Sequence, residues 1–312
     1  MINTLRDFLN KYNIKNKKVL IGFSSGPDSC ALTRLLIELK EEFNLDITLA
    51  YFNHMWRKEA KSEEGFTENF AEMYNLNYVI GKAPSGIPCN EEIARELRYE
   101  FLSDCALKLN TDTIFLAHNK NDNVETLIYR VLKGTSVKGL CSIPEVRDIY
   151  YRPLLKIEKG EILKYLDSIN QKYMVDISND DTKYKRNFIR KELIPLFEKV
   201  NPNYMNAIDN LITTSSFASK VLQNAITEVM LKVEKNGIIQ RDKYLSYGIE
   251  YRYEIINLFV GEKLKYRDFK TIKKLDDFIV ENEHSRISLN KTEFLRTRRN
   301  KIFIENIEDI KG

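Results

Sequence analysis

Residues 18–29 read Lys18-Val-Leu-Ile-Gly-Phe-Ser24-Ser25-Gly26-Pro27-Asp28-Ser29, and this stretch decides the fold of the first part of the chain. An apolar run of strand length passes directly into a turn of small residues, and a helix with a leucine-rich face follows from about residue 29. Exposed amides at the start of a helix, backed by the positive end of the helix dipole, favour phosphate binding. A lone Asp28 would repel phosphate, so its presence predicts a bridging Mg²⁺.

Two common phosphate-binding loops are excluded at this turn. No lysine follows Gly26, as the Walker A loop requires, and the glycine spacing of dinucleotide-binding folds is absent. The structural alternative is an ordinary strand-to-helix turn capped by Asp28 or Ser29. If the position of Ser25 needs a positive φ, a serine there costs about 1 kcal/mol.

The composition predicts a cytoplasmic protein with two domains. The chain has 312 residues, of which 43% are hydrophobic, and this is more than one average domain needs for its core. No apolar run has the length of a membrane span, and the N-terminus lacks a signal-peptide core, so we expect no membrane association. Four cysteines lie far apart without a Cys-x-x-Cys pair, which argues against a zinc site, an iron–sulfur cluster or a redox pair. These are Cys30, Cys89, Cys105 and Cys141.

The net charge of +4, from 49 basic and 45 acidic residues, is too small to indicate nucleic-acid binding by itself. The distribution is more informative, because three basic clusters lie in the second half of the chain, within residues 183–191, 263–274 and 296–301. A solvated helix face explains any one of them. Together they predict a surface that binds an anion.

Strand-like and helix-like segments alternate up to about residue 135. The strands are expected at 18–23, 46–52, 77–81 and 113–117, and the helices near 29–43, 62–74, 90–109 and 122–133. This alternation predicts a parallel sheet with helices on both faces, and such sheets bind ligands at the carboxyl ends of their strands. Three polar segments follow the strands and are expected to converge there, namely 24–29, 53–57 and 118–125.

The pattern changes in the second part of the chain. Helices are expected at 158–170 and from 186 to 200, and Asn201-Pro202 marks a break. Long helices at 204–235, 249–260 and 267–281 and two or three short strands at 286–289, 293–298 and 301–305 follow. The predicted fold is therefore an α/β domain with a parallel sheet over residues 1–203, followed by a smaller, mostly helical domain over residues 204–312.

Two of the polar segments contain candidate ligand-binding side chains. Asn53 and Arg57 suit contacts to a base and a phosphate, while a structural loop with Trp56 on the core is the alternative. His118 stands four residues before Asp122 at the end of a predicted strand, where it suits phosphate binding or proton transfer. Asp122 suits a Mg²⁺ ion or an incoming amine, and the neighbouring asparagines suit helix capping.

Two further segments suit nucleic acid. Arg95 and Arg98 lie on neighbouring turns of a predicted helix, for which a solvated face is the default interpretation. Tyr184 stands among lysines and arginines, as expected of a residue that stacks on a base while its neighbours contact the backbone. Cations at a helix start oppose the helix dipole, which favours an anionic ligand at this place.

The ordered motifs together resemble one family. The turn at 24–29 is similar to the PP-loop of N-type ATP pyrophosphatases, with Ser25 in place of the usual glycine. The complete set resembles the bacterial tRNA(Ile)-lysidine synthetases over residues 18 to about 200, with Asn119 and Asn121 in place of a usual histidine and aspartate. The motifs are Ser-Ser-Gly-Pro-Asp-Ser (24–29), Asn-His-Met-Trp-Arg (53–57), Ala-Arg-Glu-Leu-Arg-Tyr (94–99), Ala-His-Asn-x-Asn-Asp-Asn-x-Glu-Thr (117–126), Arg-x-Leu-Lys-Gly (130–134), Arg-Pro-Leu-Leu (152–155) and Asp-x-Ser-Asn-x-Asp-x-x-Tyr-x-Arg-Asn-x-Ile-Arg (176–190).

This resemblance implies ATP, Mg²⁺, L-lysine and a tRNA(Ile) whose anticodon begins with cytidine. The base would be adenylated on the oxygen at its carbon two, pyrophosphate would leave, and the lysine ε-amine would then displace AMP to give lysidine. Either Asp122 or Glu125 would bind the lysine and accept its proton, and the sequence does not decide between these two carboxylates. The α-phosphate would be stabilised by Mg²⁺ and by candidate cations at Arg190 or Arg186 and at His118.

The resemblance assigns the remaining roles by position. The catalytic residues would be Asp28, His118, Asp122 and Arg190, with Asp28 as the metal ligand. ATP would contact Ser24, Ser25, Gly26, Pro27, Asp28, Ser29, Asn53 and Arg57. The tRNA and its cytidine would contact Arg95, Arg98, Tyr184, Arg186, Lys273 and Lys274.

Alternatives from other classes stay open on the sequence. Another PP-loop enzyme, such as a tRNA thiolase, would deliver sulfur to an adenylated base, and it usually shows paired cysteines, which this chain lacks. A nucleotide-binding module without catalysis is the non-enzyme alternative. The sequence does not fix the oligomeric state, and a homodimer is one of the states it allows.

Overall fold

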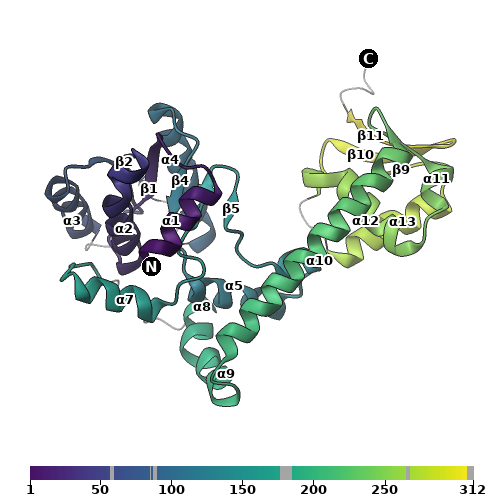
Figure 1. The fold of residues 1–312 in the computed structure, drawn as a ribbon. Coiled ribbons are helices and arrows are strands. Elements are labelled where there is room, and N and C mark those ends of the chain that lie inside the picture. The colour runs from purple at the N-terminus through teal and green to yellow at the C-terminus, as the bar shows by residue number, and fades with distance from the viewer. Residues whose placement is uncertain (57–59, 85, 87–89, 176–184, 265–267, 308–312) are drawn as a thin grey trace. The chain divides into compact units, whose positions relative to one another are not determined.

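The computed structural model describes residues 1–56, 60–84, 86, 90–175, 185–264 and 268–307 (Figure 1). Contacts between Cα atoms divide the chain into two compact units, residues 1–216 and residues 217–312. The division falls inside the long helix α10 (Tyr204–Val233), whose first residue lies next to the predicted boundary. No helix in the described part is long and apolar enough to cross a membrane.

The first unit contains a six-stranded sheet in the order β3-β2-β1-β4-β6-β5. The four predicted strands are confirmed to within one residue at each end, as β1 (Lys18–Gly22), β2 (Asp46–Asn53), β3 (Asn77–Lys82) and β4 (Ile114–Leu116), and all of them pair in parallel. β6 (Tyr150–Tyr151) is parallel to β4, and β5 (Val146–Arg147) is antiparallel to β6. These last two strands have two residues each, which is too short for the alternation of apolar and polar residues to predict them.

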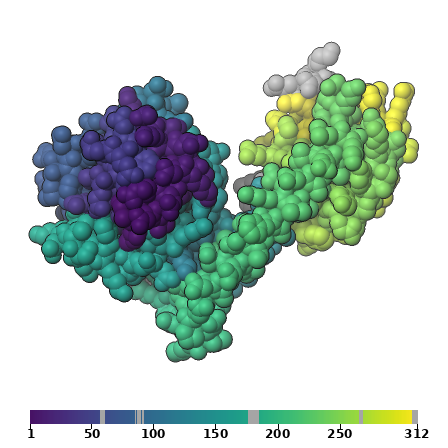
Figure 2. All heavy atoms as spheres, viewed as in Figure 1, coloured from purple at the N-terminus to yellow at the C-terminus, as the bar shows by residue number. Residues whose placement is uncertain are grey.

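Helices cover both faces of this sheet. Alternation along β1 sends Val19 and Ile21 into a core with the helices α1 (Ile2–Lys11), α2 (Pro27–Phe43), α3 (Ala60–Met73) and α7 (Lys159–Ser168). Leu20 packs on the other side, against the helix α4 (Glu91–Leu109). The parallel sheet covered on both faces confirms the predicted architecture. Helix α1, which contributes to the purple surface in Figure 2, was not predicted.

The remaining helices of the first unit lie after β4. These are α5 (Lys120–Lys133), α6 (Val137–Leu140), α8 (Lys185–Phe188) and α9 (Ile194–Val200), with a π-helical turn over Ile189–Leu193 between the last two. The single helix expected from 186 to 200 is thus interrupted. Pro195 explains this, because it cannot donate the bond to the carbonyl four residues earlier and its ring crowds that carbonyl.

The second unit packs helices on one face of a five-stranded antiparallel sheet in the order β7-β8-β11-β10-β9. The expected helices appear as α12 (Ile249–Val260) and α13 (Phe269–Glu281), and the short α11 (Arg241–Leu245) is added. The three final strands appear as β9 (His284–Ser288), β10 (Glu293–Arg298) and β11 (Lys301–Asn306). The sheet is larger than predicted, because β7 (Glu234–Lys235) and β8 (Ile238–Gln240) extend it.

Candidate functional site

The topology of the first sheet brings the loop after β1 and the loop after β4 together. In the sheet, β2 lies on one side of β1 and β4 lies on the other, so the strand order reverses at β1. Parallel sheets bind ligands at such a reversal of strand order. The contact is direct, since the Asn119 side-chain amide nitrogen Nδ2 donates to Asp28 Oδ1 over 3.1 Å. These two residues are far apart in the sequence, so the predicted convergence of these two segments is confirmed.

Ser25 has the left-handed conformation that the usual glycine would favour, with a φ of +59°. The side chain is fully buried, and its hydroxyl lies 3.1 Å from that of Thr67 on helix α3. The Ser25 carbonyl accepts a bond of 2.8 Å from the Met174 amide. The hydroxyl bond, which a glycine could not make, offsets part of a backbone cost of about 1–2 kcal/mol for a left-handed residue.

The start of helix α2 leaves backbone amides available to an anion. The first bond within the helix runs from the Cys30 amide to the Gly26 carbonyl over 3.0 Å, so the amides of Asp28 and Ser29 have no acceptor within the helix. The Ser29 hydroxyl accepts from the Ser24 amide at 3.2 Å and donates to the Gly26 carbonyl at 3.0 Å. The loop is therefore fixed by its own side chains, with the positive helix end behind it.

The Asp28 carboxylate carries a second partner that the sequence did not suggest. The ammonium of Lys159, the first residue of α7, lies 2.7 Å from Asp28 Oδ2. The Lys159 amide donates to Asn121 Oδ1 over 2.9 Å, so the asparagine that replaces the usual aspartate fixes this lysine. The sequence contained an indication of this ion pair, because a cation on the first turn of a helix opposes the helix dipole and favours an anionic neighbour.

The residues around Asp28 fit a magnesium ion that is shared with a nucleotide. Mg²⁺ in such sites is held by one or two protein carboxylates, by phosphate oxygens and by water. The described residues contain no cluster of three histidine, cysteine, aspartate or glutamate side chains that would hold a metal alone. The side chain of Asp28 is 27% exposed and can reach such an ion if the Lys159 ammonium moves aside.

Helix α5 and the π-helical turn build a charged cluster beside Asp28. Arg190 binds both oxygens of Glu125, with its Nε 2.7 Å from Oε1 and its Nη2 2.9 Å from Oε2. Glu125 is 4% exposed, so this two-pronged bond compensates a buried charge. Asp122 Oδ1 lies 3.8 Å from Arg190, and its other oxygen accepts from the Asn119 amide at 2.9 Å. Arg190 therefore lies close to both carboxylates, Asp122 and Glu125, that were predicted to bind lysine.

Asp122 is the less compensated of the two carboxylates. Burial raises its pKa to about 6, and the negative charges of Glu125 and Asp28 add to this effect. The Asn119 amide and Arg190 act in the opposite direction. Both oxygens of Glu125 are engaged by Arg190 at 2.7 and 2.9 Å, so Asp122 is the carboxylate of the pair that is more available to a ligand.

His118 lies in a buried and positive environment. Burial, followed in order of effect by the cations of Arg152, Arg98, Arg95 and Arg186, lowers its pKa to about 3. Its Nδ1 is buried and has no hydrogen-bond partner in the part of the chain that the structure describes. The lowered pKa favours a neutral imidazole at pH 7 and therefore does not favour the positive charge that was predicted for His118. It can still accept a proton or a hydrogen bond.

Tyr99 joins two of these arginines. Arg95 lies 4.8 Å above the centre of the Tyr99 ring and donates to its hydroxyl over 3.2 Å. The buried Arg152 donates to the same hydroxyl over 3.4 Å and to the Pro144 carbonyl over 3.1 Å. Burial alone would raise the pKa of Tyr99, but the neighbouring arginines outweigh it and lower this pKa. Tyr99 and Arg152 stand in quoted motifs, yet neither was singled out as a site residue.

The other candidates stand apart from this cluster. Asn53 is buried and uses its side chain internally, because Oδ1 accepts from the Met55 amide at 2.7 Å and Nδ2 donates to Glu64 at 2.6 Å. These bonds favour a role in shaping its loop. Lys273 and Lys274 are exposed on α13 in the second unit, where Lys273 pairs with Asp277. Arg57 and Tyr184 lie outside the described residues.

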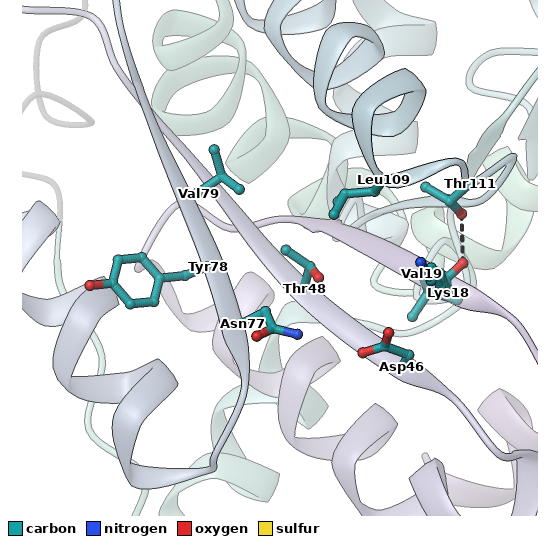
Figure 3. Close-up of a pocket in the computed structure, with 9 residues that line it drawn as sticks. All are labelled: Lys18, Val19, Asp46, Thr48, Asn77, Tyr78, Val79, Leu109 and Thr111. Atoms are coloured by element: carbon teal, nitrogen blue, oxygen red, sulfur yellow. Dashed lines mark hydrogen bonds between the residues drawn. The ribbon is translucent and has the colours of Figure 1, made fainter.

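A hollow of about 310 Å³ lies at the opposite edge of the sheet, near the amino ends of β1, β2 and β3 (Figure 3). Its lining includes Lys18, Asp46 and Asn77, and the Thr111 hydroxyl closes one side by donating to the Lys18 carbonyl over 2.6 Å. None of the motif residues named above lines it. The candidate site is therefore placed at the carboxyl edge, where parallel sheets bind their ligands.

Comparison with known proteins first defines the class. Residues 1–197 match the PP-loop domain family, so the first unit contains a PP-loop domain. A solved structure of the U34-tRNA thiolase NcsA from Methanococcus maripaludis with its [4Fe-4S] cluster is similar, with a TM-score of 0.56 over 69% of this chain and 77% of that one. The two are 19% identical, so this likeness concerns the fold alone.

Curated relatives then define the family. A tRNA(Ile)-lysidine synthase of Clostridium tetani is 37% identical over 64% of this chain and 45% of its own length. That of Petrotoga mobilis is 32% identical over 75% of this chain and 76% of its own, and that of Parabacteroides distasonis is 30% identical over 99% and 70%. The chain belongs to the tRNA(Ile)-lysidine synthase family. It spans about half the length of the Clostridium tetani relative and 60% of that of Thermosipho africanus.

Proposed function

We propose that this protein ligates L-lysine to carbon two of the wobble cytidine of a tRNA(Ile) with a CAU anticodon, at the expense of ATP. The cytidine oxygen attacks the α-phosphate and pyrophosphate leaves. The lysine ε-amine then attacks carbon two of the adenylated base, the amine loses a proton, and AMP leaves. The products are lysidine in the tRNA, AMP and pyrophosphate, and the proposed place of the reaction is the cytoplasm.

The loop after β1 supports the nucleotide-binding part of this proposal. Amides of Asp28 and Ser29 and the positive end of α2 suit the pyrophosphate portion of ATP. Asp28 would hold a magnesium ion, which supplies positive charge to the phosphates when it is bound. The Lys159 ammonium, which pairs with Asp28, would turn to the same phosphates. Arg57 stays a predicted ATP contact.

The arginines around His118 support the stabilisation of the α-phosphate and of the RNA. Negative charge accumulates on the transferred group, so preorganised cations lower the barrier. Arg95, Arg98 and Arg186 all act electrostatically on His118, which supports one shared anion site for the phosphate beside the cytidine. The cytidine must leave the anticodon stack, at a cost of a few kcal/mol, and Tyr184 stays a predicted stacking partner.

The cluster of Asp122, Glu125 and Arg190 supports the choice of an amine as the second substrate. A lysine side chain has a pKa of about 10.4, so a base must take a proton before its nitrogen can attack. We assign this step to Asp122, because its raised pKa makes it a better proton acceptor than an ordinary aspartate. Arg190 holds Glu125 in place, and Glu125 then orients the lysine or Asp122.

One observation carries the proposal: the carboxylates of Asp122 and Glu125 lie directly beside the predicted phosphate loop, with Asn119 bonded to both Asp28 and Asp122. The test incubates the protein with ATP, Mg²⁺, labelled lysine and a tRNA(Ile) transcript. Label should enter the transcript, and it should fail to enter one in which the wobble cytidine is replaced by uridine. Asp122→Asn should transfer no lysine, although it still releases pyrophosphate.

Two results would contradict the proposal. Pyrophosphate release from the wild-type protein without lysine transfer would favour another PP-loop enzyme. Binding of ATP with no release of pyrophosphate in the presence of tRNA would favour a nucleotide-binding module. A sulfur transfer is the less favoured alternative, because the chain has no Cys-x-x-Cys pair and, of the three described cysteines, only Cys141 is partly exposed. Burial raises the pKa of the Cys30 and Cys105 thiols. A homodimer stays a proposal that sedimentation would test.

A further inference from the structure

The antiparallel sheet of the second unit has two unlike faces. Side chains alternate along each strand, and Ile287, Leu295 and Ile302 point into the core against the helices. Arg296 on the central strand β10 pairs with Arg286 on β9 and with Phe303 on β11, so these three side chains share the other face. Residues from this part of the chain, yellow in Figure 2, lie at the surface of the unit.

The outer face combines positive charge with aromatic rings. Over β9, β10 and β11 it presents four cations from lysine and arginine, two half-buried phenylalanines and one carboxylate, and these aromatic residues do not belong to the core cluster of the unit. Four cations against one carboxylate leave an excess of positive charge on a short sheet. The residues are Arg286, Arg296, Arg298, Lys301, Phe294, Phe303 and Glu305.

Contacts on this face hold its groups in place. Glu305 on β11 forms an ion pair with Arg296 and lies 3.9 Å from Arg286. The Arg286 guanidinium also stands over the Phe294 ring, 4.8 Å from its centre. Two arginines on neighbouring strands are thus oriented before any ligand arrives, which reduces the entropy lost on binding.

We propose that this outer sheet face, rather than the lysines of α13 alone, binds RNA. Guanidinium groups match phosphate oxygens, and an aromatic ring on an open sheet stacks an unpaired base. Arg286 and Arg296 bind the phosphate backbone, Phe303 stacks a base, and Arg298 and Lys301 extend the positive surface along the strands. The inference rests on the proposed function only in taking tRNA(Ile) as the RNA.

The test measures binding of a fluorescent tRNA(Ile) transcript to the full chain at several salt concentrations. Each phosphate contact contributes roughly 0.7–0.9 to the slope of log affinity against log salt. The double variant Arg286→Ala/Arg296→Ala should therefore bind about tenfold or more weakly, with a slope reduced by about one to two. Phe303→Leu should weaken binding by about fivefold or more with the slope unchanged, because it removes a stack and no charge.

Matched variants separate this effect from lost folding or lost charge. Lys108→Ala/Lys164→Ala removes two exposed cations from the first unit and should bind within about twofold of the wild type. Arg286→Lys/Arg296→Lys keeps the charges and loses the planar forks, so it should keep the salt slope and recover part of the affinity. All variants should melt and bind an ATP analogue as the wild type does.

Wild-type affinity and slope in both the double arginine variant and Phe303→Leu would overturn the proposal. A competition experiment could also overturn the proposal, with polyglutamate of matched charge as the competitor. If polyglutamate displaced the RNA equally well from the wild type and from Phe303→Leu, the surface would select for charge alone. The lysine-transfer assay separates the two proposals. If the wild type binds RNA through this face but transfers no lysine, the proposed function fails; if it transfers lysine while the variants bind normally, this inference fails.

Discussion

The two units of the chain present their functional residues in different ways. In the first, the candidate residues stand in short ordered motifs directly after strands, and a parallel sheet brings such positions to one edge, as the bond between Asn119 and Asp28 illustrates. In the second, basic residues are scattered over helices and strands. Only the pairing of β9, β10 and β11 shows that Arg286, Arg296 and Phe303 share a face. Strand topology thus identifies the candidate site of the first unit, and strand register identifies the proposed RNA-binding face of the second.

Removal of Asp28 should have the largest effect, and it should affect the first unit alone. Asp28→Ala deletes the proposed metal ligand and leaves the Lys159 ammonium without its carboxylate. We expect pyrophosphate release with ATP and tRNA to fall by about 1,000-fold, because both charge stabilisation and positioning of the phosphates are lost. Binding of tRNA should change by less than about twofold, since Asp28 belongs neither to the proposed RNA-binding face of the second unit nor to the proposed cytidine contacts Arg95, Arg98 and Arg186.

Asp28→Asn is the matched control for shape. It keeps the bond to Asn119 but removes the negative charge, so its loss of pyrophosphate release should be nearly as large. If Asp28→Asn were fully active, the carboxylate would not hold a metal and the first unit would have to be interpreted differently. If either variant lost tRNA binding as well, the division of labour between the two units would be wrong.

The second prediction concerns the bond between Arg190 and Glu125. Arg190→Ala leaves a carboxylate that is 4% exposed without its cation, and such a change is strongly destabilising for a buried pair. We expect the kcat/KM for lysine to fall by about 100-fold, while the affinity for an ATP analogue stays within about threefold. Steady-state kinetics with lysine as the varied substrate measures this.

Arg190→Lys and Glu125→Gln sharpen the result. Lysine at 190 restores the charge but only one of two bonds, so it should recover part of the lost kcat/KM. An equal loss of ATP-analogue affinity and of kcat/KM for lysine in Arg190→Ala would place Arg190 at the nucleotide instead. This outcome would return it to the role at the α-phosphate that the sequence analysis considered.

The third prediction uses the raised pKa of Asp122. Its folded-state pKa of about 6 means that it becomes protonated as the pH falls through 6, and a neutral carboxyl neither holds an ammonium nor accepts its proton. We expect kcat/KM for lysine to fall about tenfold per pH unit below about pH 6. Rate profiles between pH 5 and 8 would measure this limb, and Glu125→Gln should move it to lower pH by removing a neighbouring negative charge.

Stability should respond to the same pH range in two opposite ways. The folded state binds the Asp122 proton more tightly than the unfolded state does, so this contribution favours folding at low pH and is lost as the pH rises through about 6. His118, with a pKa lowered to about 3, binds its proton less tightly when folded, so its contribution is lost as the pH falls below about 6.5. Asp122→Asn should therefore make unfolding more sensitive to acid, which urea titrations at pH 5 and 7 would show.

The sequence predicted the first unit well because alternation and motif position are local properties. The four strands follow from periodicity, and the place of a missing glycine raised the question of a positive φ at Ser25, which the structure answers with +59°. Lys159 could not be found in the same way, because its partner Asp28 lies 131 residues earlier and the two meet through the packing of α7 on α2. Tyr99 was within a motif, but its role depends on Arg152 reaching it from another segment.

The second unit was predicted less completely for a related reason. The number of basic residues in a segment does not show on which face of a strand they lie. The two strands β7 and β8, which enlarge the sheet, are too short for an alternation of apolar and polar residues to be recognised. The helices were predicted because the amphipathic period of α13 is strong over 13 residues. The lysines on the exposed side of α13 could therefore be proposed as RNA contacts from the sequence. The residues of the sheet face could be grouped only after the register of the strands was known.

The smallest expected effect distinguishes these two surfaces of the second unit. Lys273 is paired with Asp277 at 2.6 Å on the exposed side of α13, so part of its charge is already compensated. The double variant Lys273→Ala/Lys274→Ala should weaken tRNA binding by about two- to fourfold and lower the salt slope by less than one, because at most one uncompensated cation is lost. Binding of an ATP analogue should not change. Fluorescence titrations in the same salt series as for Arg286→Ala/Arg296→Ala make the comparison direct. A larger loss in the α13 variant than in the sheet variant would show that composition, and not register, located the RNA surface.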